Sequence, residues 1–329
     1  MTAELALSRR ATVFVDSLPF ELDDFQLQAI QILDRGESVV VAAPTGAGKT
    51  LAAEAAVYLA LARGRRAFYT TPTKALSNQK FVDLREIYGE SSVGLLTGDN
   101  VLNGEADVVV MTTEVLRNMI YARSSAILDL GVVILDEIHY LQDRFRGSVW
   151  EEVIIHLPEG IPLVNLSATI SNSSEFTEWI AARRGPTGLV TEVKRPVPLD
   201  PVYLLSDRHE EYRMEMLPIF DRSGTKPNPQ LRKMLKRSHG RRRRYVMPRR
   251  AEIASHLRQE GLLPSIYFIF SRAGCDRAAT IVASANLTLT NDSEREAIAR
   301  YLMMATRHIS STDLSMLGYE QWSENLLRG

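Results

Sequence analysis

The segment APTGAGKT at residues 43–50 constrains the fold most strongly, because it joins an apolar run to a helical pattern. The apolar run VVVAA at 39–43 leads into it, and LAAEAAVYLALARG at 51–64 follows. A glycine-rich turn between a buried strand and a helix directs backbone N–H groups and a helix N-terminus toward one point, where they can bind phosphate. The chain is therefore expected to contain a strand, loop and helix unit that binds nucleotide phosphates.

Individual positions of this loop have separate expected roles. Lys49 adds a positive charge for the β- and γ-phosphates of ATP, and the Thr50 hydroxyl is placed to ligate Mg²⁺. The first position of the general pattern is alanine instead of glycine, and a small residue suffices at a strand end. The expected ATP-binding segment comprises Ala43, Pro44, Thr45, Gly46, Ala47, Gly48, Lys49 and Thr50. The alternative is a glycine-rich turn with an exposed lysine, which the strand-loop-helix context disfavours.

A second apolar run, GVVILDE at 131–137, ends in two adjacent acids. Ligands of open α/β sheets bind at the carboxyl ends of the strands, so both acids are expected at that edge. Asp136 is a candidate Mg²⁺ ligand, and Glu137 a candidate base that orients and deprotonates water. His139 completes the predicted catalytic set of Lys49, Asp136, Glu137 and His139. The alternative is a pair of solvated carboxylates, with His139 serving only in packing.

The pattern from about residue 20 to 205 alternates short apolar runs with longer helical segments, which is typical of repeated βαβ units. Continuous apolar runs fit strands that are covered on both faces. The expected strands are VVVAA (39–43), AFYTT (67–71), VGLLT (93–97), DVVVMT (107–112), GVVILDE (131–137) and PLVNLSAT (162–169). The predicted fold class is α/β, with a parallel sheet between two layers of helices.

The domain organisation changes after residue 205. Residues 1–19 are expected to form an N-terminal extension, and 20–205 the nucleotide-binding domain. Residues 206–262 are rich in charge and interrupted by prolines, so they are expected to form a basic linker or insertion. A strand-like run, SIYFIFS at 265–271, then predicts the opening of a second α/β domain over 263–329, which is too short to complete one.

The charge distribution is uneven. The whole chain has 39 basic and 40 acidic residues, but residues 232–250 hold ten Lys or Arg and no acid. Clustered positive charge favours a nucleic-acid backbone as partner, and the alternative is a solvated, flexible insertion. The single cysteine, Cys275, excludes an internal disulfide, and no stretch is apolar enough to cross a bilayer. A cytoplasmic protein without a membrane partner is therefore expected.

These motifs together resemble the DExH-box helicases of superfamily 2, through DEIH at 136–139. The resemblance is to the superkiller-type RNA helicases and their actinobacterial branch, the HelY helicases, through PTKALSNQK (72–80), GLLTGD (94–99), MTTEVLRNM (111–119) and IYFIFSRAGCD (266–276). It implies a RecA-like P-loop NTPase domain followed by the beginning of a second RecA-like domain. It covers residues 20–205 densely and the segment from 262 onward more thinly.

The resemblance implies further site residues. FQLQAI at 25–30 is similar to the adenine-recognising segment, with Gln26 at the base edge and Phe25 near its face. SAT at 167–169 matches the motif that couples hydrolysis to strand movement, through Ser167 and Thr169. Side-chain hydroxyls and loop N–H groups can bind the phosphate oxygens of a nucleic acid without recognising its base sequence. The implied nucleic-acid contacts are Thr73, Lys74, Asn78, Thr97, Gly98, Thr112, Thr113, Ser271 and Arg272.

The implied function is ATP-dependent, 3′ to 5′ unwinding of RNA in RNA processing or decay, with ATP and Mg²⁺ as cofactors. A single strand of RNA or DNA, an RNA-degradation complex and a monomeric state are the implied associations. The family's arginine-finger motif and later domains do not follow, so this chain is expected to be a fragment that binds ATP but turns it over weakly. Two alternatives remain: a DNA repair helicase of a sister branch, and an inactive nucleotide- and RNA-binding module.

Overall fold

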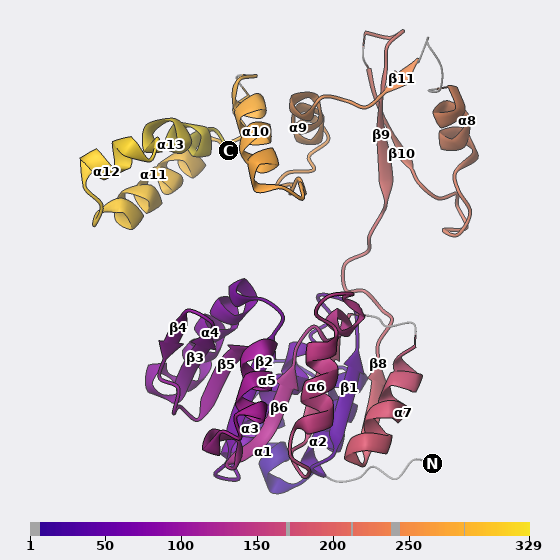
Figure 1. Cartoon of the computed structure of the whole chain (residues 1–329). Coiled ribbons are helices and arrows are strands. Elements are labelled where there is room, and N and C mark those ends of the chain that lie inside the picture. The colour runs from indigo at the N-terminus through magenta and orange to yellow at the C-terminus, as the bar shows by residue number, and fades with distance from the viewer. Residues whose placement is uncertain (1–6, 169–171, 212, 238–243, 286) are drawn as a thin grey trace. The chain divides into compact units, whose positions relative to one another are not determined.

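The computed structural model describes residues 7–168, 172–211, 213–237, 244–285 and 287–329. The chain divides into two compact units, Met1–Pro198 and Leu199–Gly329 (Figure 1). This division falls slightly before the domain boundary expected at residue 205. Each unit is described by itself below.

The first unit is built on an eight-stranded sheet with the strand order β4-β3-β5-β2-β6-β7-β1-β8. Seven of these strands are parallel, and only β4 pairs antiparallel, with β3. The strands are β1 (Ser38–Ala42), β2 (Arg66–Thr71), β3 (Val93–Thr97), β4 (Asn100–Leu102), β5 (Val108–Thr112), β6 (Leu130–Leu135), β7 (Leu163–Ser167) and β8 (Thr187–Thr191). The predicted α/β fold with a largely parallel sheet is confirmed.

Helices cover both faces of this sheet (Figure 1). One face packs against α1 (Arg9–Asp16), α2 (Asp24–Asp34), α3 (Thr50–Leu61) and α4 (Lys74–Tyr88). The other packs against α5 (Thr113–Tyr121), α6 (Ser148–His156) and α7 (Ser173–Arg184). Short 3₁₀ turns lie at η1 (Glu90–Ser92), η2 (Ser125–Ile127) and η3 (Ile138–Gln142).

Burial on both faces explains why the strands are apolar throughout. In β1, Val39 and Val41 belong to the core on one face, and Val40 belongs to the core on the other. All three side chains are fully buried. Successive strand residues point to opposite faces, so a strand between two helical layers needs apolar side chains at every position.

The second unit contains a three-stranded antiparallel sheet with the order β10-β9-β11. Its strands are β9 (Val202–Asp207), β10 (Arg213–Pro218) and β11 (Tyr245–Val246), and α8 (Pro229–Arg237) packs against it. Its small core consists of Leu205, Leu231, Met234 and Tyr245. Part of the segment expected to be a basic linker or insertion, 206–262, thus forms this sheet and helix.

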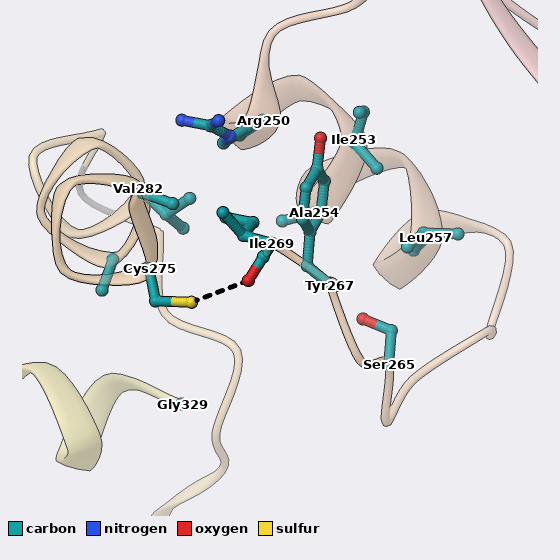
Figure 2. A pocket seen from close by; sticks show the side chains of 12 residues that line it. Arg250, Ile253, Ala254, Leu257, Ser265, Tyr267, Ile269, Cys275, Val282 and Gly329 are labelled. Atoms are coloured by element: carbon teal, nitrogen blue, oxygen red, sulfur yellow. Dashed lines mark hydrogen bonds between the residues drawn. The ribbon is translucent and has the colours of Figure 1, made fainter. Parts of the chain in front are cut away.

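The rest of the second unit is helical. It comprises α9 (Arg250–Gln259), α10 (Arg272–Ala283), α11 (Asp292–Thr306), α12 (Ser311–Met316) and α13 (Tyr319–Arg328). A cavity of about 310 Å³ lies between α9 and α10, and the segment before α10 forms one wall with Tyr267 and Ile269 (Figure 2). Cys275 contacts the Ile269 carbonyl at 3.5 Å in this cavity.

The strand expected at 265–271 is not formed, so that prediction is wrong for this structure. The segment is irregular before α10, and Ile266 and Phe268 are 81% and 76% exposed. A strand requires neighbouring strands for its backbone hydrogen bonds. In the described part of the second unit the one sheet is β10-β9-β11, which does not include these residues.

Among the helices of the described ranges, none is long and apolar enough to cross a bilayer.

The pairing of Asp207 with Arg244 predicts a specific acid sensitivity. Asp207 is 2% exposed and accepts hydrogen bonds from Nε and Nη2 of Arg244 at 2.8 and 2.6 Å. These bonds hold the pKa of Asp207 below its ordinary value, although burial opposes them. A carboxyl with a lowered folded-state pKa stabilises the fold above its unfolded pKa of about 3.9, and this stabilisation is lost as pH falls through the folded pKa.

The Asp207→Asn variant should therefore melt at a lower temperature than the parent at neutral pH, because Arg244 loses its charged partner. Its melting temperature should also fall less than the parent's between about pH 5 and about pH 2.5, as measured by circular dichroism. Asp276→Asn, which alters an exposed side chain of the same unit, is the control. Parallel pH profiles for Asp207→Asn and the parent would contradict this role.

Candidate nucleotide and nucleic-acid site

The predicted site residues of the first unit follow strand ends along one edge of the sheet. Because β1, β2, β3, β5, β6 and β7 run parallel, the segments after them meet at their shared carboxyl edge. In the strand order β3-β5-β2-β6-β7-β1, the ATP-binding loop follows β1 and the acid pair follows β6. Only β7 separates them, so these strand ends are roughly 10 Å apart, at about 4.8 Å between neighbouring strands.

The phosphate loop has the backbone that its glycines predict. Gly46 and Gly48 have φ values of +87° and +83°, in the left-handed region that favours glycine. A β-carbon at Gly48 would lie 2.6 Å from Nε2 of Gln26. The Ala43 N–H donates to the Ser167 carbonyl at 3.1 Å, which fixes the start of the loop to the end of β7. Thr45 and Gly46 are exposed at the open side of the loop, whereas Ala43 and Pro44 are buried.

Lys49 is buried without a carboxylate partner. Its exposure is 8%, and it makes no ion pair with any residue in the described ranges. Burying a charged group is unfavourable unless it is paired. A lysine held in this way at the start of α3, beside exposed loop N–H groups, fits an anionic ligand such as a nucleotide phosphate.

Asp136 is held by two donors at the end of β6. Tyr69 of β2 donates from its hydroxyl to Oδ2 at 2.7 Å, and the Glu137 N–H donates to Oδ1 at 2.9 Å. The Asp136 N–H donates to the Thr70 carbonyl at 3.0 Å, so the backbone of this acid continues the pairing with β2. Tyr69 has its pKa raised well above the ordinary value by burial and by Asp136, so its hydroxyl remains a donor at neutral pH.

Glu137 has a left-handed backbone, with φ of +53° and ψ of +46°. Such a conformation is uncommon outside glycine and frequently marks functional positions. Its carboxylate lies 3.2 Å from Nδ1 of His139, in an orientation that does not form a hydrogen bond. The strained backbone sends Glu137 away from the buried Asp136, so the two adjacent acids occupy different environments.

Ser167 lies at the end of β7, between the phosphate loop and the acids. Its hydroxyl is buried and has no partner among the described residues. Its carbonyl accepts the N–H of Ala43, as described above. Thr169, the second predicted coupling residue, lies outside the described residues.

The two residues expected to recognise adenine have structural contacts here. Phe25 is 4% exposed and belongs to the hydrophobic core beneath the sheet. Gln26 donates from Nε2 to the Gly48 carbonyl at 3.2 Å, and its Oε1 accepts the Asp23 N–H at 3.0 Å. Gln26 therefore contacts the phosphate loop and caps α2, while base recognition by both residues remains a prediction.

A groove of about 460 Å³ lies at the other half of the same edge. Four of its lining residues are predicted nucleic-acid contacts: Thr73, Lys74, Gly98 and Thr112. Pro72, Glu114, Val115, Asn118 and Arg146 complete the lining. These residues follow β2, β3, β5 and η3, so the structure brings together motifs that are far apart in the sequence.

The other predicted contacts are distributed differently. Thr113 is fully buried and donates to the Thr71 carbonyl at 3.4 Å, and Thr97 is 8% exposed. Asn78 is exposed on α4 but does not line the groove. In the second unit, the Ser271 hydroxyl caps α10 by accepting the Gly274 N–H at 3.2 Å, and Arg272 is exposed.

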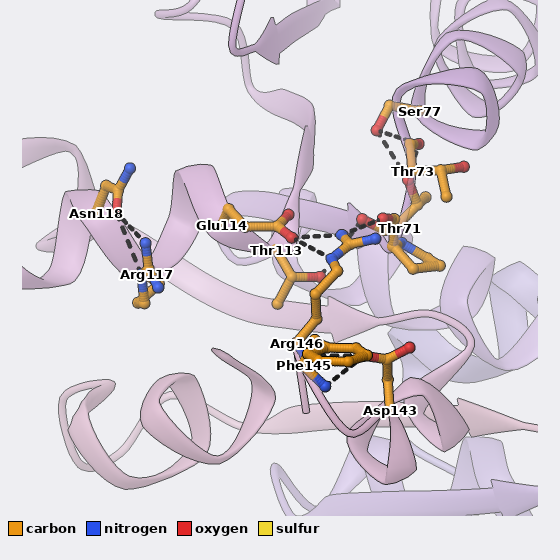
Figure 3. A network of polar contacts seen from close by, with 11 residues as sticks. Thr71, Thr73, Ser77, Thr113, Glu114, Arg117, Asn118, Asp143, Phe145 and Arg146 are labelled. Carbon is orange, nitrogen blue, oxygen red and sulfur yellow. Dashed lines mark hydrogen bonds and ion pairs between the residues drawn. The ribbon is translucent and has the colours of Figure 1, made fainter. Parts of the chain in front are cut away.

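Arg146 is a groove residue that the sequence reasoning missed. Its Nε donates to Glu114 at 2.9 Å, and its Nη2 reaches both Glu114 and the Pro72 carbonyl, the latter at 2.6 Å (Figure 3). Its own loop is shaped by Asp143, which accepts the N–H groups of Phe145 and Arg146. Arg146 thereby ties together the segments after β2, β5 and β6. No local pattern in DRFRG at 143–147 identifies it, because its partners Glu114 and Pro72 are distant in the sequence.

Comparisons with known proteins show that the chain is similar to helicases. Residues 23–176 match the DEAD/DEAH box helicase family. The chain is 48% identical to the Probable helicase HelY of Mycobacterium tuberculosis, over 96% of this chain and 36% of that protein. It is 39% identical to Superkiller complex protein 2 of Homo sapiens, over 94% of this chain and 26% of that protein.

A plant relative extends this group. The chain is 39% identical to the DExH-box ATP-dependent RNA helicase DExH15 chloroplastic of Arabidopsis thaliana, over 85% of this chain and 27% of that protein. Residues 23–176 thus carry a DEAD/DEAH box helicase domain, and over nearly its whole length the chain is homologous to the DExH helicases of the HelY and superkiller type. It spans about a third of the length of the HelY relative.

A solved structure shows the same fold. The crystal structure of the DUF1998 helicase MrfA matches 91% of this chain and 45% of that chain, with a TM-score of 0.55 at 19% identity.

The close approach of Gly48 to Gln26 predicts that Gly48→Ala will lose nucleotide affinity. Alanine would meet both an unfavourable φ of +83° and a 2.6 Å contact with the Gln26 amide. The loop N–H groups would then shift, and we expect the Kd for ATP to rise by about tenfold or more, equivalent to about 1.4 kcal/mol. Equilibrium binding of a fluorescent ATP analogue measures it.

Gly64→Ala is the matched control, because Gly64 has φ of +69° but no atom within 4 Å of the added carbon. It should lower stability by roughly 1 kcal/mol without changing ATP affinity. Equal losses of ATP affinity in the two variants would contradict the proposed geometry of the loop.

The contacts of Arg146 predict that Arg146→Ala will weaken binding of a single strand without weakening ATP binding. The variant removes the tie between Glu114, Pro72 and the loop after η3, so the groove residues lose their fixed spacing. We expect a several-fold higher Kd for a single-stranded oligonucleotide, because a 1 kcal/mol loss corresponds to about fivefold. Fluorescence anisotropy measures it.

Arg183→Ala is the control, since Arg183 is an exposed arginine of the same unit that donates to the Ile155 carbonyl and lies outside the groove lining. An unchanged Kd for the strand in Arg146→Ala, or an equal change in Arg183→Ala, would exclude the positioning role.

Proposed function

We propose that this chain contains the ATP-binding part of a helicase that couples ATP hydrolysis to movement along a nucleic-acid strand. One observation carries the proposal: the phosphate loop, the acid pair and the groove follow strand ends of a single sheet edge. The residues expected to bind the nucleotide follow β1, β7 and β6, and the groove residues follow β2, β5 and β3. The two halves meet where β6 pairs with β2.

The residues of the nucleotide half fit ATP with Mg²⁺. The loop from Ala43 to Thr50 would surround the phosphates, with Lys49 as the buried positive charge. Thr50 and Asp136 would hold Mg²⁺, which supplies charge neutralisation for the phosphates when bound. The hydrogen bond from Tyr69 to one oxygen of Asp136 orients this carboxylate.

Glu137 is the proposed general base. Its partly exposed carboxylate can accept a proton from water, whereas the Asp136 carboxylate is buried and accepts hydrogen bonds from the Tyr69 hydroxyl and the Glu137 N–H. His139 lies beside the Glu137 carboxylate and would orient it. The buried hydroxyl of Ser167 has no hydrogen-bond partner among the described residues, so it is a candidate to bond either the bound nucleotide or the nucleic-acid strand.

The finer assignment is a 3′ to 5′ RNA helicase of RNA processing or decay. Its support is the likeness to relatives named as an RNA helicase and as a superkiller complex protein. An RNA single strand, an RNA-degradation complex and a monomeric, cytoplasmic chain belong to the same proposal. The groove supports a nucleic-acid backbone as ligand through its hydroxyls and through Lys74, whose ammonium pairs with the Asp99 carboxylate in this structure. These groups do not distinguish RNA from DNA.

Two other functions compete with this proposal. A DNA repair helicase of a sister branch would use the same nucleotide residues and the same groove. An inactive nucleotide- and RNA-binding module would keep the affinities and lack turnover. The chain spans 36% of its HelY relative, so unwinding by the whole protein is also a proposal.

The test is phosphate release from ATP by the purified chain with matched RNA and DNA single strands. We expect slow release that RNA stimulates more than DNA. Glu137→Gln should lower the stimulated rate by about 10² or more, since it removes the general base, and should keep ATP affinity. Lys49→Ala should lower both the stimulated rate of phosphate release and the affinity for ATP. Glu151→Gln, an exposed change of the same chemistry, is the control.

The possible outcomes separate the three functions. Equal stimulation by DNA would remove the preference for RNA. ATP binding without any release that Glu137→Gln can lower would favour the binding module.

A further inference from the structure

The basic side chains of α8 form a surface that the proposed site does not use. Helix α8 is anchored through Leu231 and Met234, which are 6% and 8% exposed and belong to the small core with Leu205 and Tyr245. Its positions 232, 233 and 236 lie on the other side, where Arg232, Lys233 and Lys236 are exposed. The apolar anchor therefore fixes the direction in which the three charges point.

These three side chains have no acidic partner among the residues that the structure describes. Across the part of the chain that the structure describes, no ion pair involves Arg232, Lys233 or Lys236. Positions 232 and 236 are one helical turn apart, and so are 233 and 236, so the like charges repel one another.

Arg244, in the same unit, has a structural role. It makes two hydrogen bonds to the buried Asp207 and lies 3.8 Å from Glu210, so acids of the sheet balance its charge. It joins β11 to the end of β9, where Tyr245 pairs with Asp207. Among the described residues of the basic segment, Arg244 is therefore structural, whereas Arg232, Lys233 and Lys236 make no ion pair.

We propose that Arg232, Lys233 and Lys236 of α8 bind the phosphodiester backbone of a single nucleic-acid strand, without reading its sequence. The three basic side chains, which have no ion pair among the described residues, lie on one face of an anchored helix and match the spaced negative charges of a nucleic-acid strand. Binding the strand would release its counterions. No aromatic side chain lies among the three positions, so the surface supplies charge and not base stacking. This site is additional to the groove of the first unit and does not require ATP.

The experiment measures the salt dependence of strand binding by the full 329-residue chain, with a U20 RNA and a T20 DNA. The variant Arg232→Gln/Lys233→Gln/Lys236→Gln removes the face. For single strands each lost phosphate contact lowers the slope of log K against log salt by about 0.7, so the loss of three should lower it by about 2. The effect should be the same for RNA and DNA.

Two control variants sharpen the result. The α11 variant, Arg295→Gln/Arg300→Gln on α11 with Arg307→Gln at its C-cap, removes the same charge elsewhere in the unit and should leave the slope unchanged. Arg244→Gln should lower thermal stability while leaving the slope nearly unchanged. The charge reversal Lys233→Glu/Lys236→Glu, checked by circular dichroism for helix content, provides a second variant if the triple variant unfolds.

Three outcomes would overturn the proposal: an unchanged slope in the α8 variants, an equal fall in the α11 variant, or binding of polyglutamate as tight as that of RNA at equal salt. The last would indicate an acidic protein as the partner. Phosphate release stimulated by a strand tests the proposed function separately, so an unchanged slope with intact stimulation would overturn only the role of α8.

Discussion

The parallel pairing of β6, β7 and β1 is the interaction on which the site depends. It places the end of the strand that carries Asp136 two strand spacings from the loop that carries Lys49. Backbone hydrogen bonds fix this distance, because β6 pairs with β7, β7 pairs with β1, and Ala43 donates to Ser167. The backbone pairing of the sheet therefore sets the positions of the residues expected to bind the nucleotide, and exposed side chains contribute little to this geometry.

The same strand order places the nucleic-acid groove beside the nucleotide half. The segments after β2, β3 and β5 line the groove, and β2 is the direct neighbour of β6. Tyr69 on β2 contacts Asp136, while Arg146, after η3, contacts Pro72 beyond the end of β2. Tyr69 and Arg146 thus each join the chain segment that carries the acids to β2 or to the residues that follow it.

Local sequence patterns predicted most of the first unit. Each of the six expected strands exists, because continuous apolar runs between helical layers have few other solutions. The short β4 and the partly exposed β8 lack such runs, and they were missed. The positive φ values of Gly46 and Gly48 follow from their residue type, whereas the left-handed Glu137 does not. Arg146 and Tyr69 escaped notice because their importance lies in partners that are distant in the sequence.

In the second unit, prolines and charge suggested a linker. The core residues Leu205, Leu231, Met234 and Tyr245 are few and widely spaced, so no local stretch of sequence reveals the core that they share.

The irregular segment 265–271 has a consequence for the behaviour of the chain in solution. Its sequence, SIYFIFS, has no charge or proline, and Ile266, Phe268 and Phe270 are largely exposed. Uncharged, β-prone segments with unpaired backbone groups associate edge to edge with other chains. Concentrated solutions of this chain should therefore be limited by intermolecular β-association at this segment, and a charged residue introduced there would favour the monomer.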